Sequence, residues 1–223
     1  MERLKNIGVI PINKDILYSL YSELKRPDEK ISELKQKGLV IRVKRDLYVV
    51  SPKVHQQEIS TELVANHLYR PSYVSLESAL SYYGLIPERV YTVRSVCTKQ
   101  YKQYSTPLGN FEYIKVPENY FSIGINQEIV ENQYAFLIAS PEKALCDKIV
   151  TTPNLRLQSV KAMQSYLMED LRIDFEVLQN FDTEIIRQCV EVGRKKGELT
   201  MLLRFFETIE TLSQKSHCLK KIE

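Results

Sequence analysis

Lysine, arginine and short polar side chains gather between residues 30 and 45 of this 223-residue chain. Lysine and arginine bind phosphate oxygens, whereas serine and glutamine can form hydrogen bonds with the edges of DNA bases. Residues 1–53 contain 12 Lys and Arg against 7 Asp and Glu, a net charge of +5, while residues 54–150 carry −2 and residues 151–223 carry 0. The positive charge is therefore concentrated where it can displace counterions from a nucleic acid. The residues that we expect to contact DNA are Lys30, Ser32, Lys35, Gln36, Lys37, Arg42, Lys44 and Arg45.

These residues have different expected roles. The lysines and Arg42 are expected to bind phosphates, which position a protein on DNA without reading its sequence. Ser32 and Gln36 are suited to base edges, and Arg45 is suited to a minor groove. Acidic side chains at positions 28, 29 and 33 repel phosphates, so only part of this segment is expected to dock.

The first five of these residues lie in a segment with the signals of a helix over residues 28–37. Pro27 fits the first turn of a helix, and the two acids that follow it favour the positive end of the helix dipole. Ile31 and Leu34 are three positions apart, so they share one face that we expect to be buried. Gly38 adopts the left-handed conformation that ends many helices.

The other three lie on a predicted hairpin. Leu39, Ile41 and Val43 alternate with Val40, Arg42 and Lys44, which predicts a strand with one apolar face. Arg45 and Asp46 form a two-residue turn into a second strand over residues 47–50. Upstream, Asn13 can cap a helix over residues 14–24. The apolar stripe of that helix is expected to consist of Ile16, Leu17, Leu20, Tyr21 and Leu24.

Two helices followed by a basic hairpin are typical of a winged helix-turn-helix domain, and most such domains bind DNA. We therefore predict a DNA-binding domain of this kind over residues 1–53. Residues 54–223 are expected to form a mixed α/β domain whose last part, about 151–223, is helical. The predicted fold class is thus α+β.

The middle of the chain alternates helix and strand signals. Helices are predicted over residues 58–68 and 75–83, the second capped by Ser75 and ended by Gly84. Strands are predicted over residues 91–98, 111–116 and 134–139, which are rich in β-branched and aromatic side chains. Ser140, Pro141 and Glu142 then predict the start of another helix.

A basic and aromatic stretch, residues 99–104, follows the first of these strands. We interpret it as a hairpin arm whose tyrosines cover the sheet edge. Stacking of these tyrosines on single-stranded nucleic acid is the alternative, and the lysines of this stretch are candidates for extending a DNA contact.

Two segments of this region carry a family resemblance. Residues 71–85, PSYVSLESALSYYGL, and residues 138–147, IASPEKALCD, resemble two characteristic stretches of the AbiEi family. The resemblance spans roughly residues 13–150, with Asp46 at a position of the wing where the family usually has glycine. It implies an antitoxin of a type IV toxin-antitoxin system that represses its own operon by binding double-stranded DNA at its own promoter. It also implies a nucleotidyltransferase-like toxin as functional partner, neutralised without a stable complex.

Catalytic patterns are weak in this sequence. Glu142 and Asp147 are five positions apart, about 140° around a helix, which is poor geometry for two carboxylates that share a proton. No glycine is followed by lysine, as a phosphate-binding loop would require, and His55, His67 and His217 are isolated. We therefore expect no enzymatic activity.

Composition gives the remaining expectations. The sequence has no run of about 18 apolar residues and no secretory leader, so we expect a cytoplasmic protein without a membrane partner. The cysteines form no C-x-x-C pair, which favours neither a metal site nor a disulfide, and we expect no cofactor. The four cysteines are Cys97, Cys146, Cys189 and Cys218.

Two questions stay open at this stage. The carboxyl-terminal region contains apolar stripes at helical spacing, which suit either the core or the contact of a homodimer. These stripes are Val160, Met163, Leu167 and Leu171, and Leu199, Leu202, Leu203, Phe206 and Ile209. The alternative function is that of a non-catalytic module in which the winged helix and the α/β domain bind a protein partner or a ligand. Dependence of binding on salt concentration distinguishes DNA binding from this alternative.

Overall fold

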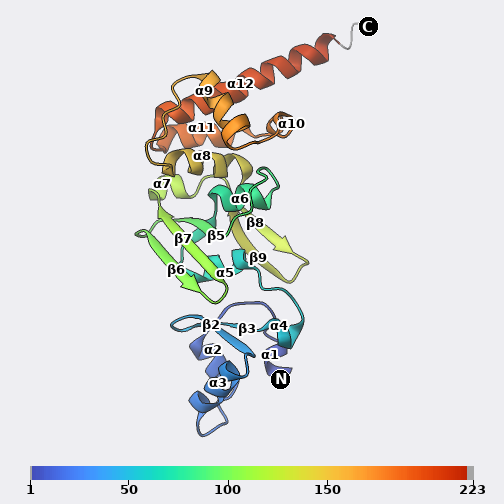
Figure 1. Ribbon diagram of the computed structural model, residues 1–223, viewed down its shortest axis with the longest axis vertical. Helices are drawn as coiled ribbons and strands as arrows, with labels where there is room; N and C mark the ends of the chain where they lie inside the picture. Colours follow the sequence, from blue (N-terminus) through green and yellow to red (C-terminus); the bar gives the residue numbers. More distant parts are fainter. Residues whose placement is uncertain (1, 220–223) are drawn as a thin grey trace.

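The computed structural model describes residues 2–219 and has an α+β fold. Figure 1 shows three tiers along the long axis of the molecule. An amino-terminal unit occupies one end, a mixed sheet lies in the middle, and a group of helices forms the other end. The predicted fold class is confirmed.

The amino-terminal unit combines short helices with a three-stranded antiparallel sheet of order β1-β3-β2. Its elements are α1 (Glu2–Lys5), β1 (Ile12–Asn13), α2 (Lys14–Ser19), α3 (Pro27–Gln36), β2 (Val40–Lys44), β3 (Leu47–Val50) and α4 (Pro52–His55). A small core between the helices and the sheet includes Leu17, Ile31, Leu34 and Tyr48. Val54 on α4 also belongs to this core, so the unit continues two residues beyond the predicted boundary at 53.

Helix α2 is shorter than predicted. Asn13 caps it as expected, since its side chain accepts a hydrogen bond from the amide of Ile16. The helix ends at Ser19, and the carbonyl of Leu20 accepts a hydrogen bond from Arg3 instead of continuing the helical ladder. Ile16 is 47% exposed, and Leu24, which lies beyond the end of the helix, is 39% exposed, so neither belongs to the predicted buried stripe.

The buried faces of the hairpin are not the ones that the sequence predicted. The register of β2 against β3 shifts between Arg42 and Lys44, which indicates a bulge. Val40 belongs to the small core, whereas Val43 and Val49 belong to the core of the rest of the molecule. The three-stranded sheet therefore has both faces covered, and it joins the amino-terminal unit to the second unit.

The second unit contains a six-stranded mixed sheet of order β6-β7-β5-β4-β9-β8. Its strands are β4 (Ser72–Val74), β5 (Thr92–Cys97), β6 (Lys102–Thr106), β7 (Gly109–Lys115), β8 (Ile125–Val130) and β9 (Tyr134–Ala139). The pairs β5–β7 and β4–β9 are parallel, and the other neighbours are antiparallel. The three predicted strands are confirmed as β5, β7 and β9, and β6 overlaps the predicted hairpin arm at residues 99–104. Strands β4 and β8 were not predicted.

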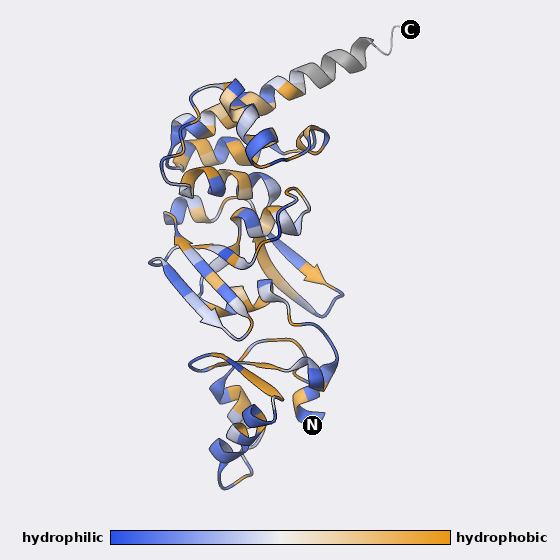
Figure 2. Ribbon diagram, in the orientation of Figure 1, coloured by the Kyte–Doolittle hydropathy of each residue, from blue (hydrophilic) through white to orange (hydrophobic). Residues whose placement is uncertain are grey.

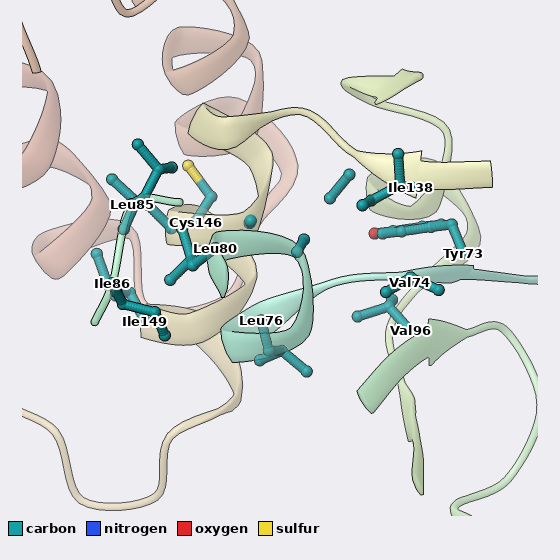
Figure 3. Close-up of a cluster of buried hydrophobic side chains, with 14 of the residues drawn as sticks. Tyr73, Val74, Leu76, Leu80, Leu85, Ile86, Val96, Ile138, Cys146 and Ile149 are labelled. Carbon is teal, nitrogen blue, oxygen red and sulfur yellow. The ribbon is translucent and has the colours of Figure 1, made fainter. Parts of the chain in front are cut away.

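Four helices of this unit pack around the sheet: α5 (Thr61–Leu68), α6 (Leu76–Tyr82), α7 (Glu118–Phe121) and α8 (Pro141–Thr151). Helix α5 begins three residues later than predicted because the side chain of Ser60 caps it by accepting from the amide of Leu63. Helices α6 and α8 lie above the sheet, and α5 lies between the sheet and the amino-terminal unit (Figure 1). Figure 3 shows Leu80 and Cys146 meeting in the core between α6 and α8.

The carboxyl-terminal helices extend the same core. They are α9 (Val160–Ser165), the π-helix η1 (Tyr166–Asp170), α10 (Phe175–Leu178), α11 (Thr183–Val192) and α12 (Lys196–Leu219). Most members of the predicted stripes are buried in the main core: Met163, Leu167, Leu171, Leu199, Leu202, Phe206 and Ile209. Val160 and Leu203 are partly buried against it. These stripes are therefore core contacts, and the homodimer stays a prediction without support from them.

Candidate nucleic-acid interface

Helix α3 presents a polar face at the far end of the amino-terminal unit. Ile31 and Leu34 are each 4% exposed and fix the helix on the small core, as predicted. Ser32 and Gln36 are exposed on the other side. Figure 2 shows this alternation of hydrophobic and hydrophilic residues along α3. The two side chains proposed to read base edges are thus free to reach a partner.

Glu33 forms ion pairs with two of the three lysines on this segment. Its carboxylate lies 2.8 Å from Nζ of Lys30 and 2.5 Å from Nζ of Lys37. The hydrogen bond from Lys30, which has the largest effect, and the hydrogen bond from Lys37 lower the pKa of Glu33 to about 2. Lys35, which is half-buried, belongs to none of the ion pairs among the described residues. A phosphate that binds Lys30 or Lys37 must therefore compete with Glu33.

The turn between β2 and β3 carries a strongly exposed cation. The side chain of Arg45 is 89% exposed, and its Nε lies 3.5 Å from the carboxylate of Asp46. Asp46 has a φ of 61°, the left-handed conformation that aspartate tolerates better than most residues. Arg42 is also exposed, and its Nε donates to the carbonyl of Lys44 at 3.3 Å. Both arginines are placed where a duplex could contact them.

Lys44 has a different position from the one expected. Its ammonium group donates a hydrogen bond to the carbonyl of Leu68, the last residue of α5. It also lies 5.8 Å from the ring centroid of Tyr104. Burial, followed by the charges of Lys99 and Arg70, lowers the pKa of Lys44. This lysine holds the hairpin against the second unit, so it is less available for phosphate than its sequence position suggested.

A second group of cations adjoins Lys44 on the edge of the large sheet. Nζ of Lys99 lies 5.6 Å from the ring centroid of Tyr69, and Nζ of Lys102 lies 5.9 Å from that of Tyr104. Strand β6 pairs antiparallel with β7, which confirms the interpretation of residues 99–104 as a hairpin arm. Tyr104 packs on the sheet edge with its ring centroid 5.9 Å from that of Tyr113. The lysines of this arm are the ones that the sequence analysis named as candidates for extending a DNA contact.

A groove of about 610 Å³ separates the β2–β3 turn from the second unit. Asn13 and Arg45 line one side of it, and His67 and Arg70 line the other. Arg70 was not selected from the sequence, because a single arginine after a predicted helix gives no signal of a site. The groove brings cations from both units to one surface.

A buried polar network joins the two segments that carried the family resemblance. Lys143 and Asp147 on α8 are both fully buried, with Nζ of Lys143 3.1 Å from Oδ1 of Asp147. Tyr73 and Ser75 donate hydrogen bonds to Oδ2 of Asp147 at 3.0 and 2.7 Å. Lys143 donates to the carbonyl of Tyr120 at 2.9 Å, and its Nζ is 3.2 Å from the centroid of that ring. Because both charged side chains are fully buried, the network offers no surface to a substrate.

The structure corrects one sequence-based expectation about these residues and agrees with another. Ser75 does not cap α6, because its hydroxyl binds Asp147 instead. Glu142 lies apart from Asp147, since its carboxylate accepts from the amide of Asp182 at 3.0 Å. The carboxylates at 142 and 147 therefore serve two separate contacts.

Among residues 2–219, no group of three or more His, Cys, Asp or Glu side chains is arranged to hold a metal ion. His55 and His67 are bound to backbone carbonyls at 3.1 and 3.0 Å. No helix in the described part of the chain is long and apolar enough to span a membrane.

Comparisons with known proteins agree with this fold. No protein-family model and no curated protein sequence matches the chain. Among solved structures, it is similar to the RV2827C protein from Mycobacterium tuberculosis. The match has 13% sequence identity and a TM-score of 0.61, and it covers 94% of this chain and 75% of that chain. At this identity, the similarity shows the fold alone.

Proposed function

We propose that this protein binds double-stranded DNA through α3 and the β2–β3 turn and represses its own promoter. The observation that carries the proposal is the arrangement of Arg42, Arg45 and the polar face of α3 on one small rigid unit. A helix followed by a hairpin with exposed cations is the arrangement by which winged helices contact a groove and the adjacent phosphates. The proposal assigns no catalytic step to the chain.

We further propose that the protein is the antitoxin of a type IV toxin-antitoxin operon. This step depends on the resemblance of residues 71–85 and 138–147 to the AbiEi family. The buried network gives these segments a common role in stability, because Tyr73 and Ser75 of the first bind Asp147 of the second. The functional partner would be a nucleotidyltransferase-like toxin. Co-expression with the product of a neighbouring gene of that class, scored as recovery of growth, tests this step.

Salt dependence of DNA affinity tests the first proposal. Each phosphate contact that releases a counterion contributes about −0.9 to the slope of log affinity against log salt. The double substitution Arg42→Ala with Arg45→Ala should therefore make the slope shallower by about two, as measured by fluorescence anisotropy with the promoter duplex. Lys44→Met should change the slope less, because Lys44 already binds the carbonyl of Leu68. Lys161→Ala, an exposed cation on α9, is the matched control.

A protein-binding module is the second candidate function. Its supporting observation is that two large apolar side chains of the amino-terminal unit, Ile16 and Leu24, are exposed. Glu33 also reduces the net charge of the α3 surface by pairing with Lys30 and Lys37. Affinity for DNA that is weak, insensitive to salt and unchanged by the arginine substitutions would favour this second function over DNA binding.

A further inference from the structure

Strands β4 and β9 leave a gap at one end of the large sheet. They lie parallel and pair at one position among the described residues, Val74 opposite Ile138. Figure 3 shows these two residues close together in the core. Beyond this pair, the side chain of Asn66 takes the place of a neighbouring strand. Its Nδ2 donates a hydrogen bond to the backbone carbonyl of Leu137 at 3.1 Å, and its Oδ1 accepts one from the backbone amide of Leu137. A side chain thus closes a position that a longer β4 would have filled.

A cavity of about 440 Å³ occupies this gap. Phe121 and Ala135 contribute apolar surface to its lining, and Gln127 and Arg70 contribute polar groups. The volume is within the range of small-molecule sites, which are mostly apolar with a few convergent polar groups. The size and the lining therefore suit a compact organic molecule better than a peptide or a metal ion.

The guanidinium of Arg70 is the polar group of the cavity that a ligand can reach, because Arg70 is exposed. The hydroxyl of Ser72 has no hydrogen-bond partner within residues 2–219, but it is inaccessible to solvent and offers no contact to a molecule in the cavity. Arg70 takes part in none of the ion pairs between described residues. No acidic side chain lines the cavity, so Arg70 is its only charged group at neutral pH if His67 is neutral.

Burial favours this neutral state of His67. Its Nδ1 lies 3.0 Å from the carbonyl of Leu63, so the neutral ring carries its proton on Nδ1 and has Nε2 as an acceptor. Burial lowers the pKa of His67 below its ordinary value. The cavity therefore presents one permanent positive charge beside apolar surface.

We propose that this cavity binds a small organic anion with a flat apolar body. The guanidinium of Arg70 holds the anionic group, because arginine matches the planar geometry of carboxylate and similar groups. Phe121 and the aliphatic surface around Ala135 cover the apolar body. This ligand site does not depend on the proposed DNA binding, although Arg70 and His67 also line the groove beside the β2–β3 turn.

Naphthoate is a suitable probe, and its uncharged counterpart naphthamide tests the role of charge. The chain contains no tryptophan, so naphthalene fluorescence can be followed without indole emission. We expect saturable binding of naphthoate to the full chain and about tenfold weaker binding of naphthamide, as loss of one charge-assisted hydrogen bond implies. Arg70→Gln should remove this preference. Arg45→Gln, which changes a residue of the neighbouring groove outside the cavity lining, should retain it.

Blocking the cavity gives a second measurement. Ala135 and Leu137 are two positions apart on β9 and share one face of the sheet, so Ala135→Phe should fill the space and prevent binding of both probes. Circular dichroism establishes whether this variant folds. If it does not, shifts of the backbone amide signals of Ser72 and Leu137 in NMR spectra of the unmodified protein decide the location. Absence of saturable binding, equal affinity for both probes, or amide shifts confined to other regions would overturn the proposal.

Discussion

The buried pair of Lys143 and Asp147 makes the strongest prediction about stability. Both side chains are fully buried, and Asp147 also accepts hydrogen bonds from Tyr73 and Ser75. In Lys143→Met, the carboxylate keeps these two donors and loses its counterion. Removal of one partner from a buried ion pair typically costs about 3–5 kcal/mol, because the other charge stays buried without compensation. That cost is a large fraction of the free energy of unfolding of a typical domain, about 5–15 kcal/mol.

The double variant separates charge compensation from packing. Asp147→Asn retains an oxygen that can accept from Tyr73 and Ser75, but it leaves the ammonium of Lys143 with only the carbonyl and ring of Tyr120. We expect each single substitution to be strongly destabilising. We expect Lys143→Met with Asp147→Asn to be less destabilising than the sum of the two by about 2 kcal/mol or more, because neither charge then lies unpaired.

Urea denaturation followed by circular dichroism measures these free energies. Arg187→Met is a control, since Arg187 forms an exposed pair with Glu184 at 2.8 Å on α11 and should matter little. Additive effects in the double variant, or a cost below about 1 kcal/mol for Lys143→Met, would refute the assigned coupling.

Three other predictions follow from single contacts. Gly193→Ala should destabilise the protein by about 1–3 kcal/mol in thermal denaturation, since a Cβ there would collide with the carbonyl of Cys189. Gly197→Ala is the control: its Cβ would lie in open space on α12, so it should be neutral or slightly stabilising. Tyr113→Phe should lower the free energy of unfolding by about 1 kcal/mol in urea titrations, because the buried hydroxyl donates at 2.7 Å to a backbone carbonyl of α5; no change would mean that the bond is not formed. Burial lowers the pKa of His67 below 6.5, so its contribution to stability is complete above that pH and is lost as the pH falls through the lowered value. As the pH decreases from 6.5 to the lowered pKa, the free energy of unfolding should fall more steeply than in His67→Gln, by at most about 1.4 kcal/mol per pH unit. Parallel pH profiles of the two proteins would contradict this assignment.

Local signals in the sequence predicted several elements correctly. Ser140 caps α8 by accepting a hydrogen bond from the amide of Lys143 at 3.2 Å, and Pro141 occupies the first turn, as expected. The same holds for Asn13 at the start of α2 and for the turn at Asp46. In each case, the contacts that define the structure lie within a few residues of one another. Short strands such as β4, with three residues, are too brief to produce a periodic pattern.

The candidate interface was predicted only in part for a related reason. The sequence identified Arg42 and Arg45 as accessible cations, because alternation along a strand and the position of a turn are local properties. It did not indicate that Lys44 would bind the carbonyl of Leu68 or that Arg70 would lie across the groove. Those contacts join residues that are distant along the chain.

The sequence by itself determined the types and order of most long elements, the α+β class and the concentration of positive charge near one end. Only the tertiary structure decided that Lys44 is not free, since the carbonyl of Leu68 accepts a hydrogen bond from it, whereas Glu33 pairs with Lys30 and Lys37 within one helical segment. It also decided that the hydroxyl of Ser75 binds Asp147 rather than capping a helix. The physical reason is that burial removes competing water, so a polar group binds the partner that the fold places beside it rather than the partner nearest in sequence.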